Sequence, residues 1–211
     1  MIKLIGKFII FKQYLCILAK TIEVRLLIID NYDSFTFNLV QIVDQIGICE
    51  YRIVKNDKLN SIDPLIFQKV LISPGPGIAS EAGDLLSFMK KYYQSKSMLG
   101  ICLGYEAIGE LLGAKLSKLP QPLHGYQNKA SQIKQTKLFQ NIPKVFSIGH
   151  YHSWIFYEED IPSNLEVIVK DEDGLPMAIQ SVDYDLFGLQ FHPESIMTDY
   201  GKEIIENWLK L

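Results

Sequence analysis

The chain of 211 residues carries a formal net charge of −3 at pH 7, and 48% of its residues are hydrophobic. Such a chain can bury one sizeable core, so we expect one α/β domain. The weakly acidic balance, without a dense lysine or arginine run, argues against a nucleic-acid partner. Three sparse cysteines, at Cys16, Cys49 and Cys102, are typical of a reducing compartment, so we expect a cytoplasmic protein.

The first 23 residues mix apolar side chains with four lysines. No uninterrupted apolar run approaches the roughly 20 residues that span a bilayer. A secretory signal would also need a clean apolar region followed by a small-residue cleavage site. We therefore expect residues 1–23 to be an N-terminal extension, with the domain at 24–211 and no membrane partner. A helix lying on a membrane surface is the alternative.

From Val24 onward, continuous apolar runs alternate with segments of helical period. Continuous apolar runs are typical of strands buried on both faces in a parallel sheet. The expected elements are a strand at 24–29, a helix at 35–46, strands at 48–54 and 69–72, and a helix at 81–93. Asp33 or Ser34 can cap the first helix, and Gly47 can end it. Parallel strands joined by helices predict a doubly wound sheet.

After Gly113 the pattern changes to short β-prone segments separated by turn residues. The expected strands lie at 114–119, 144–148, 165–170, 177–182 and 186–191, followed by a closing helix at 199–209. Asp173-Gly174 and residues 183–185 are the expected hairpin turns. The second half of the chain therefore predicts a largely antiparallel β elaboration.

The segment Gly100-Ile101-Cys102-Leu103-Gly104 joins an apolar run to a segment of helical period. This pattern predicts a strand, a sharp turn and a helix, with Cys102 in strained geometry and glycines that allow close backbone approach. The N-terminus of the helix should favour a thiolate and can bind an oxyanion. Cys102 is a candidate nucleophile, and a buried structural cysteine is the alternative.

A rigid loop, Ser73-Pro74-Gly75-Pro76-Gly77, directly follows the expected strand at 69–72. Its prolines fix φ, and its glycines leave amide groups approachable. Ligands of open parallel sheets bind outside the carboxyl ends of the strands, so this loop and the Cys102 turn should face one crevice. An ordinary tight turn is the alternative interpretation.

The base for Cys102 is expected in Phe191-His192-Pro193-Glu194-Ser195. Residues two apart point to the same side of an extended segment, so Glu194 can contact His192. A carboxylate beside an imidazole fixes its tautomer, as in a triad of nucleophile, base and orienting acid. No paired zinc-type spacing links the histidines with the cysteines, so we expect no metal. The competing bases are His124, His150 and His152.

Five ordered motifs between Val24 and Leu211 closely resemble the class I, or triad, glutamine amidotransferases. Within that family they are most similar to the amidotransferase components of anthranilate synthase and para-aminobenzoate synthase. The motifs are Asp30-Asn31-Tyr32-Asp33-Ser34-Phe35-Thr36, Ser73-Pro74-Gly75-Pro76-Gly77, Gly100-Ile101-Cys102-Leu103-Gly104, Tyr151-His152-Ser153 and Phe191-His192-Pro193-Glu194-Ser195.

The resemblance implies hydrolysis of L-glutamine through a thioester on Cys102, with His192 and Glu194 completing the triad. Ammonia would pass to a chorismate-binding synthase large subunit, and no cofactor is implied. The oxyanion and glutamine contacts implied by motif position are Gly75, Pro76, Gly77, Leu103, Glu106, Ser153 and Trp154. Synthesis of anthranilate is the leading hypothesis. The para-aminobenzoate role and a catalytically weak regulatory subunit are the alternatives.

The chain departs from the family pattern beside these motifs. The family usually has His-Gln where this chain has Tyr105-Glu106, and commonly has arginine in place of His150. Downstream of His124-Gly125, residues 126–128 replace a lysine and small hydroxyl residues. These departures bear on substrate affinity and on signalling with the partner, whereas the triad is intact.

Overall fold

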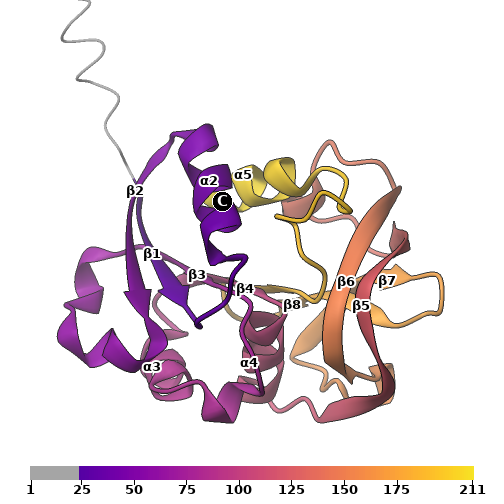
Figure 1. The fold of residues 1–211 in the computed structure, drawn as a ribbon, viewed down its shortest axis with the longest axis horizontal. Coiled ribbons are helices and arrows are strands. Elements are labelled where there is room, and N and C mark those ends of the chain that lie inside the picture. Colours follow the sequence, from indigo (N-terminus) through magenta and orange to yellow (C-terminus); the bar gives the residue numbers. More distant parts are fainter. Residues whose placement is uncertain (1–23) are drawn as a thin grey trace, which may run out of the picture.

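The computed structural model describes residues 24–211, which form a nine-stranded mixed sheet with helices on both faces (Figure 1). The strand order is β2-β1-β3-β4-β9-β8-β7-β5-β6. The expectations for residues 1–23 lie outside the described residues. No helix within 24–211 is long and apolar enough to cross a membrane.

The first five strands in this order run parallel and form the doubly wound part of the sheet. They are β2 (Cys49–Lys55), β1 (Val24–Asp30), β3 (Lys69–Ile72), β4 (Ser97–Ile101) and β9 (Leu186–Leu189). The predicted strands of the first half are confirmed within a residue or two. The last strand was predicted as part of the antiparallel elaboration, but it inserts beside β4 in parallel register, with Ile101 opposite Leu189.

The remaining strands are antiparallel, as predicted. They are β8 (Pro176–Ser181), β7 (Leu165–Asp171), β5 (Leu116–Gln132) and β6 (Val145–Phe156). The strands predicted at 114–119 and 144–148 are short pieces of β5 and β6. Two register shifts in β5, after Lys118 and after His124, let this long strand accommodate Pro120, Pro122 and Gly125, which otherwise interrupt a strand pattern.

Two helices cover each face of the parallel half of the sheet. The helices α2 (Thr36–Ile46) and α5 (Gly201–Lys210) lie on one face, and α3 (Leu85–Tyr92) and α4 (Leu103–Leu111) lie on the other (Figure 1). Short 3₁₀ segments lie at Asn56–Ser61, Pro64–Ile66, Ala79–Glu81, Lys137–Phe139 and Glu158–Asp160. The helix predicted at 81–93 begins later, at Leu85, because a 3₁₀ turn precedes it.

Strand β1 illustrates why both faces need helices. Leu26 and Ile28 belong to the core beneath α2 and α5, whereas Leu27 and Ile29 belong to the core beneath α3 and α4. Successive side chains of a strand point to opposite faces, so a continuous apolar run buries both. The helix α2 ends as predicted at Gly47, whose φ of 66° is left-handed.

Candidate active site

Cys102 lies in a sharp turn between β4 and α4, with φ 51° and ψ −102°. A positive φ is costly for any residue with a Cβ atom, so this backbone is strained, as predicted. The flanking glycines make the turn possible. A Cβ on Gly100 would lie 2.2 Å from the carbonyl of Gly104, and one on Gly104 would lie 2.8 Å from the Ile72 oxygen. Only glycine fits at either position.

The electrostatics of the Cys102 thiol correct one expectation. The helix N-terminus was predicted to favour the thiolate, but burial raises the pKa of Cys102 well above its ordinary value, and the charges of Glu106 and Glu194 raise it further. The backbone N–H of Leu103 acts in the opposite direction and is outweighed. The resting side chain is therefore a neutral thiol that needs a base.

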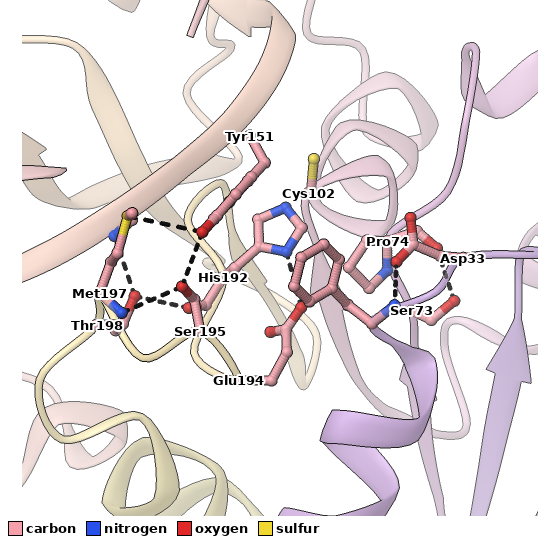
Figure 2. A network of polar contacts seen from close by, with 12 residues as sticks. Asp33, Ser73, Pro74, Cys102, Tyr151, His192, Glu194, Ser195, Met197 and Thr198 are labelled. Atoms are coloured by element: carbon pink, nitrogen blue, oxygen red, sulfur yellow. Dashed lines mark hydrogen bonds and ion pairs between the residues drawn. The ribbon is translucent and has the colours of Figure 1, made fainter. Parts of the chain in front are cut away.

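His192 and Glu194 form the predicted pair, with His192 Nδ1 2.7 Å from Glu194 Oε1 and both residues buried. A carboxylate can only accept, so Nδ1 carries the proton and donates it. His192 Nε2 is buried without a hydrogen-bond partner in the described part of the chain. Figure 2 shows the imidazole between the Glu194 carboxylate and Cys102 in this view. The nitrogen that a general base requires is thus free.

The backbone reason given for this pair was wrong. The segment is a turn and not an extended strand, since Ser195 N–H donates to the His192 carbonyl at 3.2 Å. Pro193 and Glu194 occupy the two central positions of this turn. A side chain beyond the turn also stabilises it, because Thr198 Oγ1 donates to the His192 carbonyl at 2.6 Å. The His192 N–H donates to Gly149 of β6 at 3.3 Å.

The sheet order brings the predicted motifs together at the carboxyl ends of β3, β4 and β9, as expected for one crevice. The loop after β3 packs against Asn31, because a Cβ on Gly75 would lie 2.6 Å from Asn31 Cβ and 3.4 Å from Leu103 Cδ2. Asn31 N–H donates to Ser73 Oγ at 2.9 Å, which ties the two loops together. Gly75 and Leu103 are therefore neighbours.

The other predicted glutamine contacts differ in their surroundings. Pro76 and Gly77 are exposed, while Ser153 and Trp154 are half-buried near the end of β6. On this strand it is Tyr151 that packs on the triad, with its ring centroid 5.0 Å from that of His192. Glutamine binding by these four residues stays a prediction.

Sequence reasoning missed residues that support the triad. Gln190 is fully buried just after β9, and its Nε2 lies 3.8 Å from Cys102 Sγ. Phe35 packs edge-on against His192, with ring centroids 5.6 Å apart. The position of Gln190 two residues before His192 was the available signal, but its burial depends on β9 lying beside β4.

Comparison with known proteins decides the family. A model described as glutamine amidotransferase class-I matches residues 27–211. The chain belongs to this family. Anthranilate synthase component 2 of Lactococcus lactis is 41% identical over 194 residues, 87% of this chain and 93% of that protein. Anthranilate synthase component 2 of Mycobacterium tuberculosis is 39% identical over 192 residues, 88% of this chain and 81% of that protein. The resemblance is confirmed.

A solved structure supports the same fold. The crystal structure of a glutamine amidotransferase from Thermotoga maritima matches with a TM-score of 0.68, covering 89% of this chain and 81% of that chain at 18% identity. At this level of identity the likeness concerns the fold alone. The predicted fold class, a doubly wound sheet with an antiparallel elaboration, is confirmed.

This glutamine amidotransferase also buries a pair of histidines beside the triad. His150 Nδ1 lies 3.1 Å from His152 Nε2, and His150 Nε2 lies 2.7 Å from Asn128 Oδ1. The second ring reaches the Trp154 carbonyl, 3.0 Å from His152 Nδ1. Burial lowers the pKa of both histidines to about 4. Both rings are therefore neutral at pH 7, and neither is free to replace His192 as the base.

Proposed function

We propose that this chain is the glutaminase subunit of an anthranilate synthase and that Cys102, His192 and Glu194 are its catalytic triad. The observation that carries the proposal is the hydrogen bond between His192 and Glu194, which leaves His192 Nε2 without a partner within 24–211. The strained turn with the Cys102 thiol ends the neighbouring strand β4. A thiol, a base and an orienting carboxylate in this order are suited to acyl transfer.

The first half of the reaction forms a thioester. His192 Nε2 takes the Cys102 proton as sulfur attacks the side-chain amide carbon of glutamine. The negative charge that develops on the amide oxygen is stabilised by the N–H groups of Gly75 and Leu103, which we assign as an oxyanion hole on the packing of these two residues. In comparable sites one such donor contributes about 3 kcal/mol. His192 then gives its proton to the departing nitrogen, and ammonia leaves.

The second half releases glutamate. Water attacks the thioester carbon while His192 Nε2 takes a proton from it. The C–S bond breaks, and that proton returns to the Cys102 sulfur. Glu194 accepts from Nδ1–H throughout and stabilises the imidazolium that forms twice in the cycle. The chain's own residues suffice for both steps.

The ammonia would be used by a chorismate-binding large subunit. Relatives named anthranilate synthase component 2 support this partner, since a second component presupposes a first. We propose a cytoplasmic location for the assembly. We also propose that residues 24–211 form the amidotransferase domain and residues 1–23 an extension of it, consistent with a family match over residues 27–211.

Reconstitution tests the proposal. The purified chain is mixed with the anthranilate or the para-aminobenzoate synthase large subunit of its own organism, chorismate and glutamine, and the aromatic product is identified. We expect anthranilate, and a loss of about 10³-fold or more in glutamine-dependent activity in Cys102→Ser. The control is Cys49→Ser, since Cys49 lies on β2 away from the turn. Product only with the para-aminobenzoate subunit, or full activity of Cys102→Ser, would contradict the proposal.

A further inference from the structure

Glu106 is a buried acid in the first turn of α4, directly behind the proposed nucleophile. Glu106 is only 3% exposed, and its backbone N–H donates to the Cys102 carbonyl at 3.0 Å. Carboxylates are almost never buried to this degree unless a cation or a metal neutralises them. The surroundings of Glu106 therefore decide its protonation state.

The groups that surround Glu106 and Cys102 are acidic or neutral. The helix α4 itself contributes Glu110 and the buried phenol of Tyr105. The segment after β9 contributes the amide of Gln190, followed by the proposed triad residues His192 and Glu194. The loop after β1 contributes Asp33. His192 is already hydrogen-bonded to Glu194. None of the ion pairs within 24–211 includes Glu106. No cation within the described part of the chain forms an ion pair with this carboxyl.

Gln190 lies beside the nucleophile and is fully buried. Its Nε2 lies 3.8 Å from Cys102 Sγ. Its Oε1 is buried without a partner in the described part of the chain. Gln190 is uncharged, so it does not balance an ionised Glu106. Because burial without a cation penalises the charged form, the neutral acid is the form that this site favours.

We propose that Glu106 and Cys102 share a pocket that holds one negative charge, so that Glu106 assists catalysis as a neutral acid and suppresses thiolate formation when it ionises. Two like charges in one buried site oppose each other's ionisation, and the pair titrates in two coupled steps. Glu106 is thereby a positioning residue that makes the proposed glutaminase sensitive to alkaline pH. The inference rests on the proposed function.

The order of the two steps follows from the burial of each group. Burial raises the pKa of Glu106 to about 8, with Glu110 adding to the rise and Gln190 opposing it. Burial and the Glu106 charge raise the pKa of Cys102 well above its ordinary value. As pH rises through 8 the charge therefore appears first on Glu106, and the thiol becomes harder to ionise.

Alkylation of Cys102 in the free chain tests this without glutamine or a partner. The rate constant for iodoacetamide is measured from pH 6 to 10, with the labelled peptide identified by mass spectrometry. At pH 6 wild type and Glu106→Gln should react equally, because the side chain at position 106 is uncharged in both proteins. At pH 9 we expect the variant to react about tenfold faster, which corresponds to a thiol pKa lower by about one unit.

The matched control is Glu110→Gln, which removes the same group one turn further along α4 from a partly buried site. Its rate should stay within about twofold of wild type at both values of pH. A Glu106→Gln ratio that is the same at pH 6 and pH 9 would overturn the proposal, since repacking alone has no reason to depend on pH. This readout is independent of glutaminase activity, so loss of the proposed function and loss of this inference are distinguishable.

Infrared titration of the wild-type chain keeps the proposal testable if Glu106→Gln does not fold. A carboxylic acid C=O band that disappears near pH 8 is the expected result. If every carboxyl has ionised by pH 6, Glu106 carries its charge throughout the working range and the proposal is wrong.

Discussion

Glu194 Oε1 lies 2.7 Å from His192 Nδ1, and the two residues reach each other across a turn that contains Pro193. The charge of the carboxylate, and not only its shape, should matter. We expect Glu194→Gln to fold normally but to lower kcat for glutamine hydrolysis by about 10²–10⁴-fold, because an amide neither fixes the tautomer nor stabilises the imidazolium. Steady-state kinetics with a thermal melt measures both effects.

The control for this variant is Glu203→Gln, which removes an exposed carboxylate from α5. It should leave kcat unchanged and lower the melting temperature by no more than about a few degrees, since Glu203 lies in the first turn of α5. If Glu194→Gln keeps more than about a third of the wild-type kcat, Glu194 is not the orienting member of a triad.

Glycines in this fold serve two separate purposes, which two variants can resolve. Gly100 has no left-handed φ, but its Cβ would lie 2.2 Å from the Gly104 backbone. Gly125 has a φ of 64° and nothing within 4 Å of its Cβ position. We expect Gly125→Ala to lower the free energy of unfolding by about 1 kcal/mol, from backbone strain alone. Gly100→Ala should lower it by about 4 kcal/mol or more and abolish activity.

Urea denaturation measures both free energies of unfolding. Equal losses in the two variants would mean that the turn at Cys102 can shift to admit a methyl group. The close packing of β4 against α4 would then not be what holds the nucleophile in place.

The parallel half of the fold could be predicted because its signals are local. The side chains of β1 form a continuous apolar run, so both faces of the strand are buried. The helical period of α2 ends at Gly47, because glycine adopts the left-handed φ that ends a helix. The 17 residues of β5 could not be predicted, because the prolines at 120 and 122 mimic a loop. Only pairing with β6, across two register shifts, shows that the strand continues.

The arrangement of the proposed triad depends partly on local spacing and partly on the order of the strands. The spacing of Cys102, His192 and Glu194 was visible in the sequence, and the sheet order brings them together. The burial of Glu106 and the position of Gln190 beside the thiol depend on the insertion of β9 next to β4. No local pattern encodes that insertion, so the burial that contributes most to the raised pKa of Cys102 could not be predicted.

Residues 1–23 should be dispensable for the chemistry, because every proposed catalytic residue lies within 24–211. We expect a chain that begins at Val24 to keep glutaminase activity and binding of the large subunit within about twofold of the full chain. Activity measurements and analytical size exclusion with the large subunit check this. If the shortened chain is insoluble or fails to bind, the apolar residues of the extension complete a core or an interface.

Acid should unfold this protein partly through its buried histidines. His150 and His152 lie in contact, and burial lowers the pKa of each to about 4. In the unfolded chain a histidine takes up its proton near pH 6.5. Between pH 6.5 and 4 the unfolded state therefore binds more protons, so the free energy of unfolding falls as the pH falls through this window. One such histidine, titrating alone, contributes about 3 kcal/mol.

The pair titrates as a unit because the rings are in contact, with His150 Nδ1 3.1 Å from His152 Nε2, so the combined loss is smaller than twice this value. The variant His150→Gln removes one titrating group and can still hydrogen-bond to Asn128. We expect its free energy of unfolding, measured in urea at intervals from pH 7 to 4, to fall with about half the wild-type slope. The exposed His124 provides the control, and His124→Gln should follow the wild-type curve. A His150→Gln curve parallel to wild type would mean that the two rings already hold an extra proton in the folded state at pH 6.5, so that the pair is a buried cation instead of two neutral rings.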